Sequence, residues 1–169
     1  MRLHRLLLAF LPALAVLVMA AAPAVAASAD DPQTVRAMQS HLGAIETWRT
    51  GPEAVARHCK NRDPEGIAAR EVKLAAWQAE QADLRGEAEE RFNRLVPLTL
   101  PASYPPEVVR ASVQVELLKI MFLGRTPEEA VTICRAFTHP DFPLWSASRI
   151  EKVRAAIKAL DEWAGNGPR

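Results

Sequence analysis

The two cysteines carry the most definite chemistry in this sequence. Cys59 and Cys134 are the only cysteines among 169 residues, and an even number of cysteines in an exported chain indicates disulfide pairing more often than free thiols. We therefore predict that Cys59 and Cys134 form a disulfide, either within one chain or between two copies. Two buried free thiols are the alternative.

Three histidines are the candidate metal ligands and general bases. His41, His58 and His139 lie far apart in the sequence, and no two of them have the spacing of three or four residues that places two ligands on one helical turn. The sequence therefore predicts no metal ion and no cofactor. A metal site assembled by the tertiary fold, or an enzyme that pairs His41 or His58 with a carboxylate of a long helix, is the alternative.

Other motifs of catalysis are missing from the sequence. It contains no nucleophile elbow, phosphate-binding loop, dinucleotide fingerprint or C-x-x-C-H haem motif, and it has 7 scattered glycines with which to build one. Glu128 and Glu129 follow Thr126-Pro127 as the acidic residues of a capping box do. We therefore assign them to a helix start rather than to a catalytic acid pair.

One tripeptide has a counterpart in a known family. His139-Pro140-Asp141 resembles the HPD signature of J-domain co-chaperones, and the resemblance covers these three residues. The preceding helix has Arg135 as its one basic residue, where that family carries a basic partner-binding helix. A turn around Pro140 explains the tripeptide, and we assign the chain to no family.

The N-terminal residues have the pattern of an export signal. Residues 1–26 place Arg2 and Arg5 before an apolar run and end in the small-x-small sequence Ala24-Val25-Ala26. The apolar run is too short for a membrane-spanning helix and contains Pro12. We predict a cleaved signal peptide over 1–26 and a periplasmic or secreted protein without stable membrane insertion. An uncleaved anchor is the alternative.

Composition narrows the class of protein and of partner. The full chain is 49% hydrophobic and 24% charged, as in an ordinary globular domain. Its formal net charge of +1, with no basic block, argues against nucleic acid as a partner. We predict one all-helical domain over residues 27–169.

Hydrophobic periodicity predicts helices in the first half of this domain. Residues 31–51 form one amphipathic helix, and Pro52 opens a short helix over 53–60 that carries Cys59. A long helix then runs from Asp63-Pro64 to Leu95, with Gln81 interrupting its apolar seam.

Prolines and apolar residues dominate the middle of the chain. Four prolines over 97–106 predict an extended crossover, in which Leu98 and Leu100 are buried. A free Pro-rich recognition segment is the alternative. Residues 107–123 are the most apolar helix, with apolar side chains on all sides, which predicts a central position in the fold.

A short helix over 127–137 carries Cys134, and a last helix begins near Ser148. The two cysteine-bearing segments match in Pro, Glu, Cys and a following basic residue at a constant offset of 75. This match indicates either a duplicated three-helix unit or a chance similarity. The predicted fold class is all-α, a bundle of about four long helices plus two short cysteine-bearing helices.

The loop between the last two helices is the candidate partner-binding segment. It contains Phe142, Leu144 and Trp145, which Pro140 and Pro143 keep out of a helix. The loop either covers the core or anchors a partner, because aromatic residues dominate interface hot spots.

The functional prediction is a non-catalytic exported protein that binds another protein, as inhibitors, immunity proteins and adaptors do, through the face that contains this loop. The alternative is a carrier of a small ligand, with a pocket between the helices. That pocket would be lined near Trp77, Met121 and Phe122.

Overall fold

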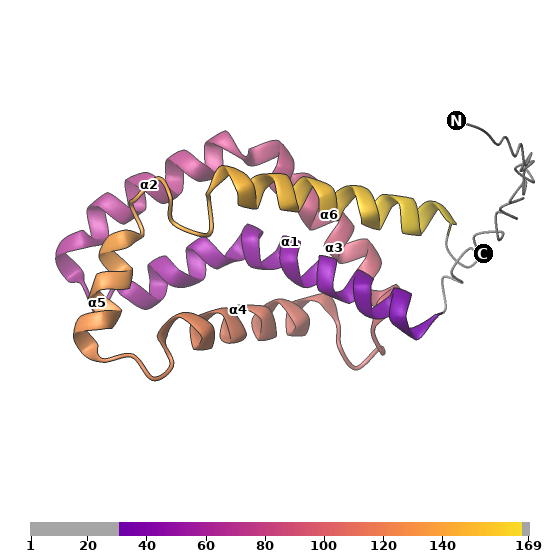
Figure 1. Ribbon diagram of the computed structural model, residues 1–169, viewed down its shortest axis with the longest axis horizontal. Helices are drawn as coiled ribbons and strands as arrows, with labels where there is room; N and C mark the ends of the chain where they lie inside the picture. Colours follow the sequence, from indigo (N-terminus) through magenta and orange to yellow (C-terminus); the bar gives the residue numbers. More distant parts are fainter. Residues whose placement is uncertain (1–30, 167–169) are drawn as a thin grey trace, which may run out of the picture.

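The computed structural model describes residues 31–166, and over this range the chain is helical, with no strand (Figure 1). The elements are α1 (Pro32–Cys59), the 3-10 turn η1 (Pro64–Gly66), α2 (Ile67–Glu80), α3 (Ala82–Thr99), α4 (Pro106–Phe122), α5 (Pro127–Ala136) and α6 (Ala147–Asn166). The predicted all-α bundle is confirmed. The predicted signal peptide over 1–26 lies outside the described residues. No helix within residues 31–166 is long and apolar enough to cross a bilayer.

The first helix is the central element of the bundle. In Figure 1, α4 lies along one side of α1, α2 and α6 lie along the other, and α3 passes from the α6 side toward the start of α4. The short helix α5 crosses the end of α1 that carries Cys59. The buried side chains of α1 therefore face either α4 or the other helices of the bundle.

α1 is one helix of 28 residues, so the predicted break at Gly51 and the separate short helix over 53–60 are wrong. Pro52 lies inside α1, where its missing N–H and its ring disfavour a helix by about 3 kcal/mol. Both Gly51 and Pro52 are buried, and packing on both sides of α1 outweighs this local cost. A single short cysteine-bearing helix, α5, remains, and the structure gives no support to a duplicated three-helix unit.

The predicted long helix over 64–95 is divided at Gln81, whose φ of −110° and ψ of 18° leave the α region. α3 then continues through Pro97 to Thr99, so the predicted extended crossover over 97–106 is shortened to a turn between Thr99 and Pro106. Leu98 is 66% exposed, which contradicts its predicted burial. Pro97 removes one N–H donor from α3, and the helix continues for only two residues beyond it.

The most apolar helix lies at the edge of the fold and not at its centre, contrary to the prediction. Leu117 is the one buried residue of the 17 in α4. Large apolar side chains on α4 and directly after it are exposed by 42 to 77%: Val108, Val115, Ile120 and Leu123. Because α1 already fills the centre, α4 covers α1 with one face and leaves both of its flanks open to water.

Candidate functional site

The predicted disulfide is present, and it forms within one chain. Cys59 ends α1 and Cys134 lies in α5, with their Cα atoms 5.5 Å apart and both residues fully buried. The bridge therefore fixes α5 across the end of α1. No thiol is free in this pair, so neither cysteine is available for nucleophilic chemistry.

A buried ion pair lies next to the disulfide. The Arg70 guanidinium, 2% exposed, donates to the carboxylate and to the backbone carbonyl of Asp63. Its Nη2 also donates to the carbonyl of Cys59 at 3.4 Å. Arg135 of α5 approaches the same Asp63 carboxylate at 3.7 Å. These contacts order the turn between α1 and α2. They also give the buried side chains of Asp63 and Arg70 hydrogen-bond partners.

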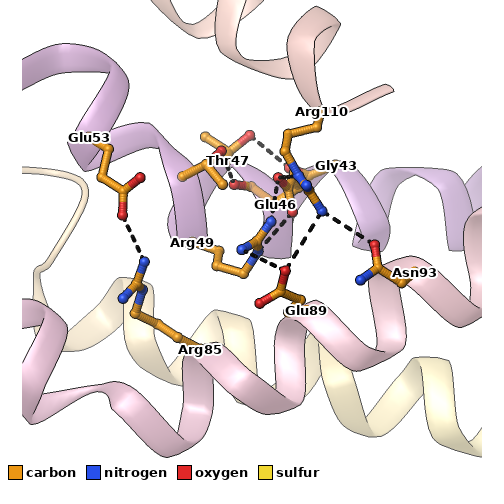
Figure 2. Close-up of polar contacts among 10 residues, drawn as sticks. Gly43, Glu46, Thr47, Arg49, Glu53, Arg85, Glu89, Asn93 and Arg110 are labelled. Carbon is orange, nitrogen blue, oxygen red and sulfur yellow. Dashed lines mark hydrogen bonds and ion pairs between the residues drawn. The ribbon is translucent and has the colours of Figure 1, made fainter. Parts of the chain in front are cut away.

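A second buried cluster joins three helices, and Figure 2 shows it. Glu46 of α1 is fully buried and accepts two hydrogen bonds from Arg49, at 2.9 and 3.0 Å. Arg110 of α4 donates to the same carboxylate at 3.0 Å. Each carboxylate oxygen of Glu46 thus has a guanidinium partner, and the group is buried away from any open reaction site, which is unlike the position of a general base.

The cluster extends to α3 on its outer edge (Figure 2). The Glu89 carboxylate lies 3.5 Å from Arg49 and 4.0 Å from Arg110, and Asn93 accepts a hydrogen bond from Arg110 at 3.3 Å. Two carboxylates face two guanidinium groups, so their charges cancel. We assign the cluster to holding α4 and α3 on α1, since a buried pair is stabilised only when every partner is in place.

Sequence reasoning missed this cluster, although the sequence holds a signal for it. Glu46 and Arg49 are next to Ile45 and Trp48, two residues of the apolar stripe of α1. A charged residue beside such a stripe is buried when the helix has neighbours on two sides. That condition is set by the fold and not by the helix itself.

The three candidate histidines do not meet. His41 and His58 lie on α1, about 25 Å apart at the rise of an α-helix, and His139 is exposed in the loop after α5. Within residues 31–166, no group of three or more His, Cys, Asp and Glu side chains is placed to hold a metal ion. The Asp141 N–H donates to His139 Nδ1 at 3.2 Å, so this histidine shapes its own turn.

The predicted partner-binding loop packs on the core. Phe142, Leu144 and Trp145 are 5 to 7% exposed. The Trp145 ring lies 4.4 Å from the Phe137 ring, centroid to centroid, and its Nε1–H donates to the His139 carbonyl at 2.9 Å. Partner binding through these three side chains stays a prediction, and it would require the loop to leave the core.

The predicted carrier pocket would need residues from two sides of α1. Trp77 of α2 is 3% exposed and packs edge-on against Trp48, with ring centroids 5.4 Å apart. Met121 and Phe122 are half-buried on α4, on the other side of α1 (Figure 1). The fold therefore separates Trp77 from the other two side chains.

Three hollows instead follow one another along one flank of α4. The first, of about 340 Å³, lies between α1 and α4, and the second, of about 320 Å³, shares His58, Val115 and Leu118 with it. The third, of about 530 Å³, shares Arg62 and Phe122 with the second and extends to Val131 of α5. Because neighbouring hollows share lining residues, they form one continuous surface depression, which we name the α4 groove.

The groove has an apolar floor and a basic rim. Val115, Leu118 and Phe122 of α4 form the floor. The basic residues that line it are Arg57, His58, Arg62, Lys119 and Arg125. No Asp or Glu is among the lining residues of the three hollows, all of which belong to residues 31–166. The groove is therefore apolar with a positive edge.

His58 and Phe122 meet in the middle of the groove. Their ring centroids are 4.3 Å apart, and the Arg62 guanidinium lies 5.9 Å from the Phe122 ring centroid. Burial lowers the pKa of His58 below its usual value, and the positive charge of Arg62 lowers it further. The imidazole is therefore neutral at pH 7, and the arginines supply the positive charge of the groove.

The opposite flank of α4 carries a smaller hollow of about 290 Å³. Val109, Val113 and Ile120 line it together with Glu116, and no basic residue does. The two flanks of α4 are thus both apolar but differ in the sign of their charged edge.

Comparisons with protein-family models, with curated proteins and with solved structures found no match for this chain. The function is therefore inferred from the chain's own residues.

Proposed function

We propose that this protein is exported and acts without catalysis by binding another protein through the exposed surface of α4. The signal pattern of residues 1–26 and the Cys59–Cys134 disulfide support an oxidising compartment outside the cytoplasm, periplasmic or extracellular. Inhibitor, immunity protein and adaptor are the classes that fit such a small binding protein.

The exposed apolar surface of α4 is the observation that carries this proposal. The side chains of Ile120 and Leu123 are each 77% exposed, and that of Val115 is 51% exposed. Monomeric proteins rarely leave contiguous apolar surface uncovered, and such patches mark interaction sites. The surface belongs to a regular helix held on α1 by the Glu46 cluster, so it is preorganised for a partner and needs little ordering on binding.

The buried polar groups support binding over catalysis. The buried Glu46 and Asp63 carboxylates are each paired with arginines, and His41, His58 and His139 belong to no cluster of three or more possible metal ligands among the described residues. A catalytic site needs a nucleophile or base within hydrogen-bond reach of an open reaction site. The surface of α4 needs none of these groups to bind a partner.

The test begins with a photo-crosslinking residue placed at Leu123 or at Val72 in the full-length protein, in living cells. Leu123 lines the α4 groove, and Val72 is a matched control, because it is 72% exposed on α2, away from α4. The partner captured from Leu123 is then purified and titrated by calorimetry against Leu123→Asp and Val72→Asp. We expect at least about a tenfold loss of affinity for Leu123→Asp and none for Val72→Asp.

Equal affinity of wild type and of the α4 variants Leu123→Asp, Val115→Asp and Ile120→Asp for that partner would show that α4 is not the binding surface. Circular dichroism of each variant checks that it is folded, since all three replaced side chains are exposed.

A further inference from the structure

We infer that the α4 groove binds an amphipathic helix of the partner protein, with Asp or Glu residues along one edge of its apolar face. This inference rests on the proposed function and names the chemistry of the partner segment that docks there.

The charge of the groove indicates an acidic occupant. The groove is lined by three arginines. Arg57 lies in the first hollow, Arg62 in the second and third, and Arg125 in the third, beside α5. None of the three has a carboxylate oxygen within 4.0 Å among the described residues. Lys119, in contrast, is already paired with Glu116 at 2.7 Å. Three guanidinium groups beside an apolar floor can each take a carboxylate from a partner.

Arg57 shares a second hollow with two acidic residues. It also lines a separate hollow of about 260 Å³ together with Glu53 and Glu71. Glu53 is paired with Arg85 at 2.8 Å and Glu71 with Lys60 at 3.5 Å. Among residues 31–166, the charge of Arg57 is therefore not neutralised by an ion pair.

The shape of the groove favours a helix over a small molecule. The groove follows α4 and is open to water, since Val115 on its floor is 51% exposed and Leu123 beside it is 77% exposed. Small-ligand sites enclose most of their ligand, whereas a molecule lying here would keep one side in water. An apolar groove beside a helix is the surface into which an amphipathic helix docks its apolar face.

The opposite flank of α4 helps to decide which way the acidic edge of the partner helix faces. Glu116 lies at its hollow, where no basic residue is found. A partner helix whose acidic edge faced that flank would meet no unpaired arginine there, because Glu116 is the one charged residue of its hollow and is already paired with Lys119. The arginine flank is therefore the one that an acidic edge selects.

A second copy of this chain is a poorer occupant of the groove. In a twofold symmetric contact the same surface faces itself. Two copies of a groove lined by arginines and by no Asp or Glu would bring positive charges together without compensation. The unmatched charge points to a different protein.

The test uses two synthetic helical peptides of about 18 residues, a length that spans the groove. Both carry leucines on one face, and one has Glu and the other Lys at the flanking positions. Fluorescence anisotropy is measured with the purified, disulfide-bonded protein. We expect at least about tenfold tighter binding of the Glu peptide and weaker binding as salt is raised.

Two triple variants with the same net charge test whether the preference for the Glu peptide depends on the arginines of the groove. Arg57→Glu, Arg62→Glu and Arg125→Glu together should reverse the preference, so that the Lys peptide binds more tightly. Arg36→Glu, Lys152→Glu and Arg154→Glu change exposed residues away from the groove and should leave the preference as in wild type. Val115→Asp should weaken binding of both peptides, because it places a charge on the apolar floor.

Equal binding of the two peptides by wild type, or the same preference in both triple variants, would overturn this inference. Tighter binding to phosphatidylglycerol vesicles than to the Glu peptide, lost in the groove variant, would assign the groove to a membrane surface and would also overturn it. A partner that depends on Leu123 but not on the three arginines would leave the proposed function standing and this inference refuted. If the arginine-dependent peptide preference holds but no cellular partner depends on α4, the proposed function fails and not the groove chemistry.

Discussion

The two sides of α1 differ in how they use apolar residues. On one side, α6 buries a single stripe made of Val153, Ile157 and Leu160, each at most 6% exposed. On the other side, the more apolar helix α4 buries Leu117 and leaves both flanks in contact with water. Burial thus depends on the number of neighbours that a helix has. The α6 side supplies stability, and the α4 side keeps apolar surface for a partner.

The largest expected change in stability comes from a substitution that disrupts the packing of α6. Leu160→Ala removes a fully buried side chain and should lower the free energy of unfolding by about 2 to 5 kcal/mol. Ile120→Ala removes the same kind of group from the exposed surface of α4 and should change it by less than about 0.5 kcal/mol. Urea unfolding followed by circular dichroism measures both, and similar losses in the two variants would contradict the contrast between the sides.

Removal of the disulfide is expected to cause the second-largest loss of stability. Replacing both Cys59 and Cys134 by Ser should lower the free energy of unfolding by about 2 to 4 kcal/mol, because a loop of 75 residues is no longer closed in the unfolded chain. The same urea experiment, on purified variant and wild type, measures the change. A variant as stable as wild type would mean that the packing of α5 alone holds it on α1.

A smaller loss of stability, local to α4, is expected when the hydrogen bond between α4 and α1 is removed. Arg110→Ala removes the hydrogen bond from α4 to the buried Glu46 carboxylate and should lower the free energy of unfolding by about 1.5 to 3 kcal/mol. Hydrogen exchange should accelerate in α4 before it does in α6, because this bond attaches α4 to α1. Uniform acceleration in both helices would show that the cluster stabilises the whole bundle equally.

The smallest expected effect is a pH dependence confined to the groove. The pKa of His58 is lowered in the folded protein, so the unfolded chain binds a proton at a higher pH than the folded chain does. Stability should therefore fall as the pH decreases below the usual histidine pKa of about 6.5. NMR titration of the His58 ring should give a pKa below that value, and His58→Gln should remove this part of the pH dependence.

Sequence reasoning succeeded where a structural signal is local. The capping box of Thr126 and Glu129 is present as predicted, with the Glu129 N–H donating to Thr126 Oγ1 at 3.2 Å and the Thr126 N–H to Glu129 at 2.8 Å. The Cys59–Cys134 pairing followed from cysteine count and compartment, and the structure adds that it closes within one chain. Both signals depend on a few residues and on general chemistry.

Sequence reasoning failed where two local signals conflicted, and where neighbouring helices decide which residues are buried. Pro52 predicted a break, yet α1 continues because both of its sides are packed. The apolar residues of α4 predicted a central helix, but a periodic pattern reports which faces are apolar and not how many of them other helices cover. The candidate groove escaped prediction for the same reason, since its lining residues Arg57, Phe122 and Val131 come from three separate helices, α1, α4 and α5.

The sequence by itself determined that this protein is helical, where α5 begins and which cysteines pair, because propensity, capping and cysteine chemistry act over short distances. The tertiary structure alone decided that α1 is central and that Glu46 is buried in an ion-pair cluster. It also decided that the loop of Phe142 and Trp145 packs inward while α4 remains exposed. These outcomes depend on which elements become neighbours in space, and burial is a property of that arrangement and not of any single segment.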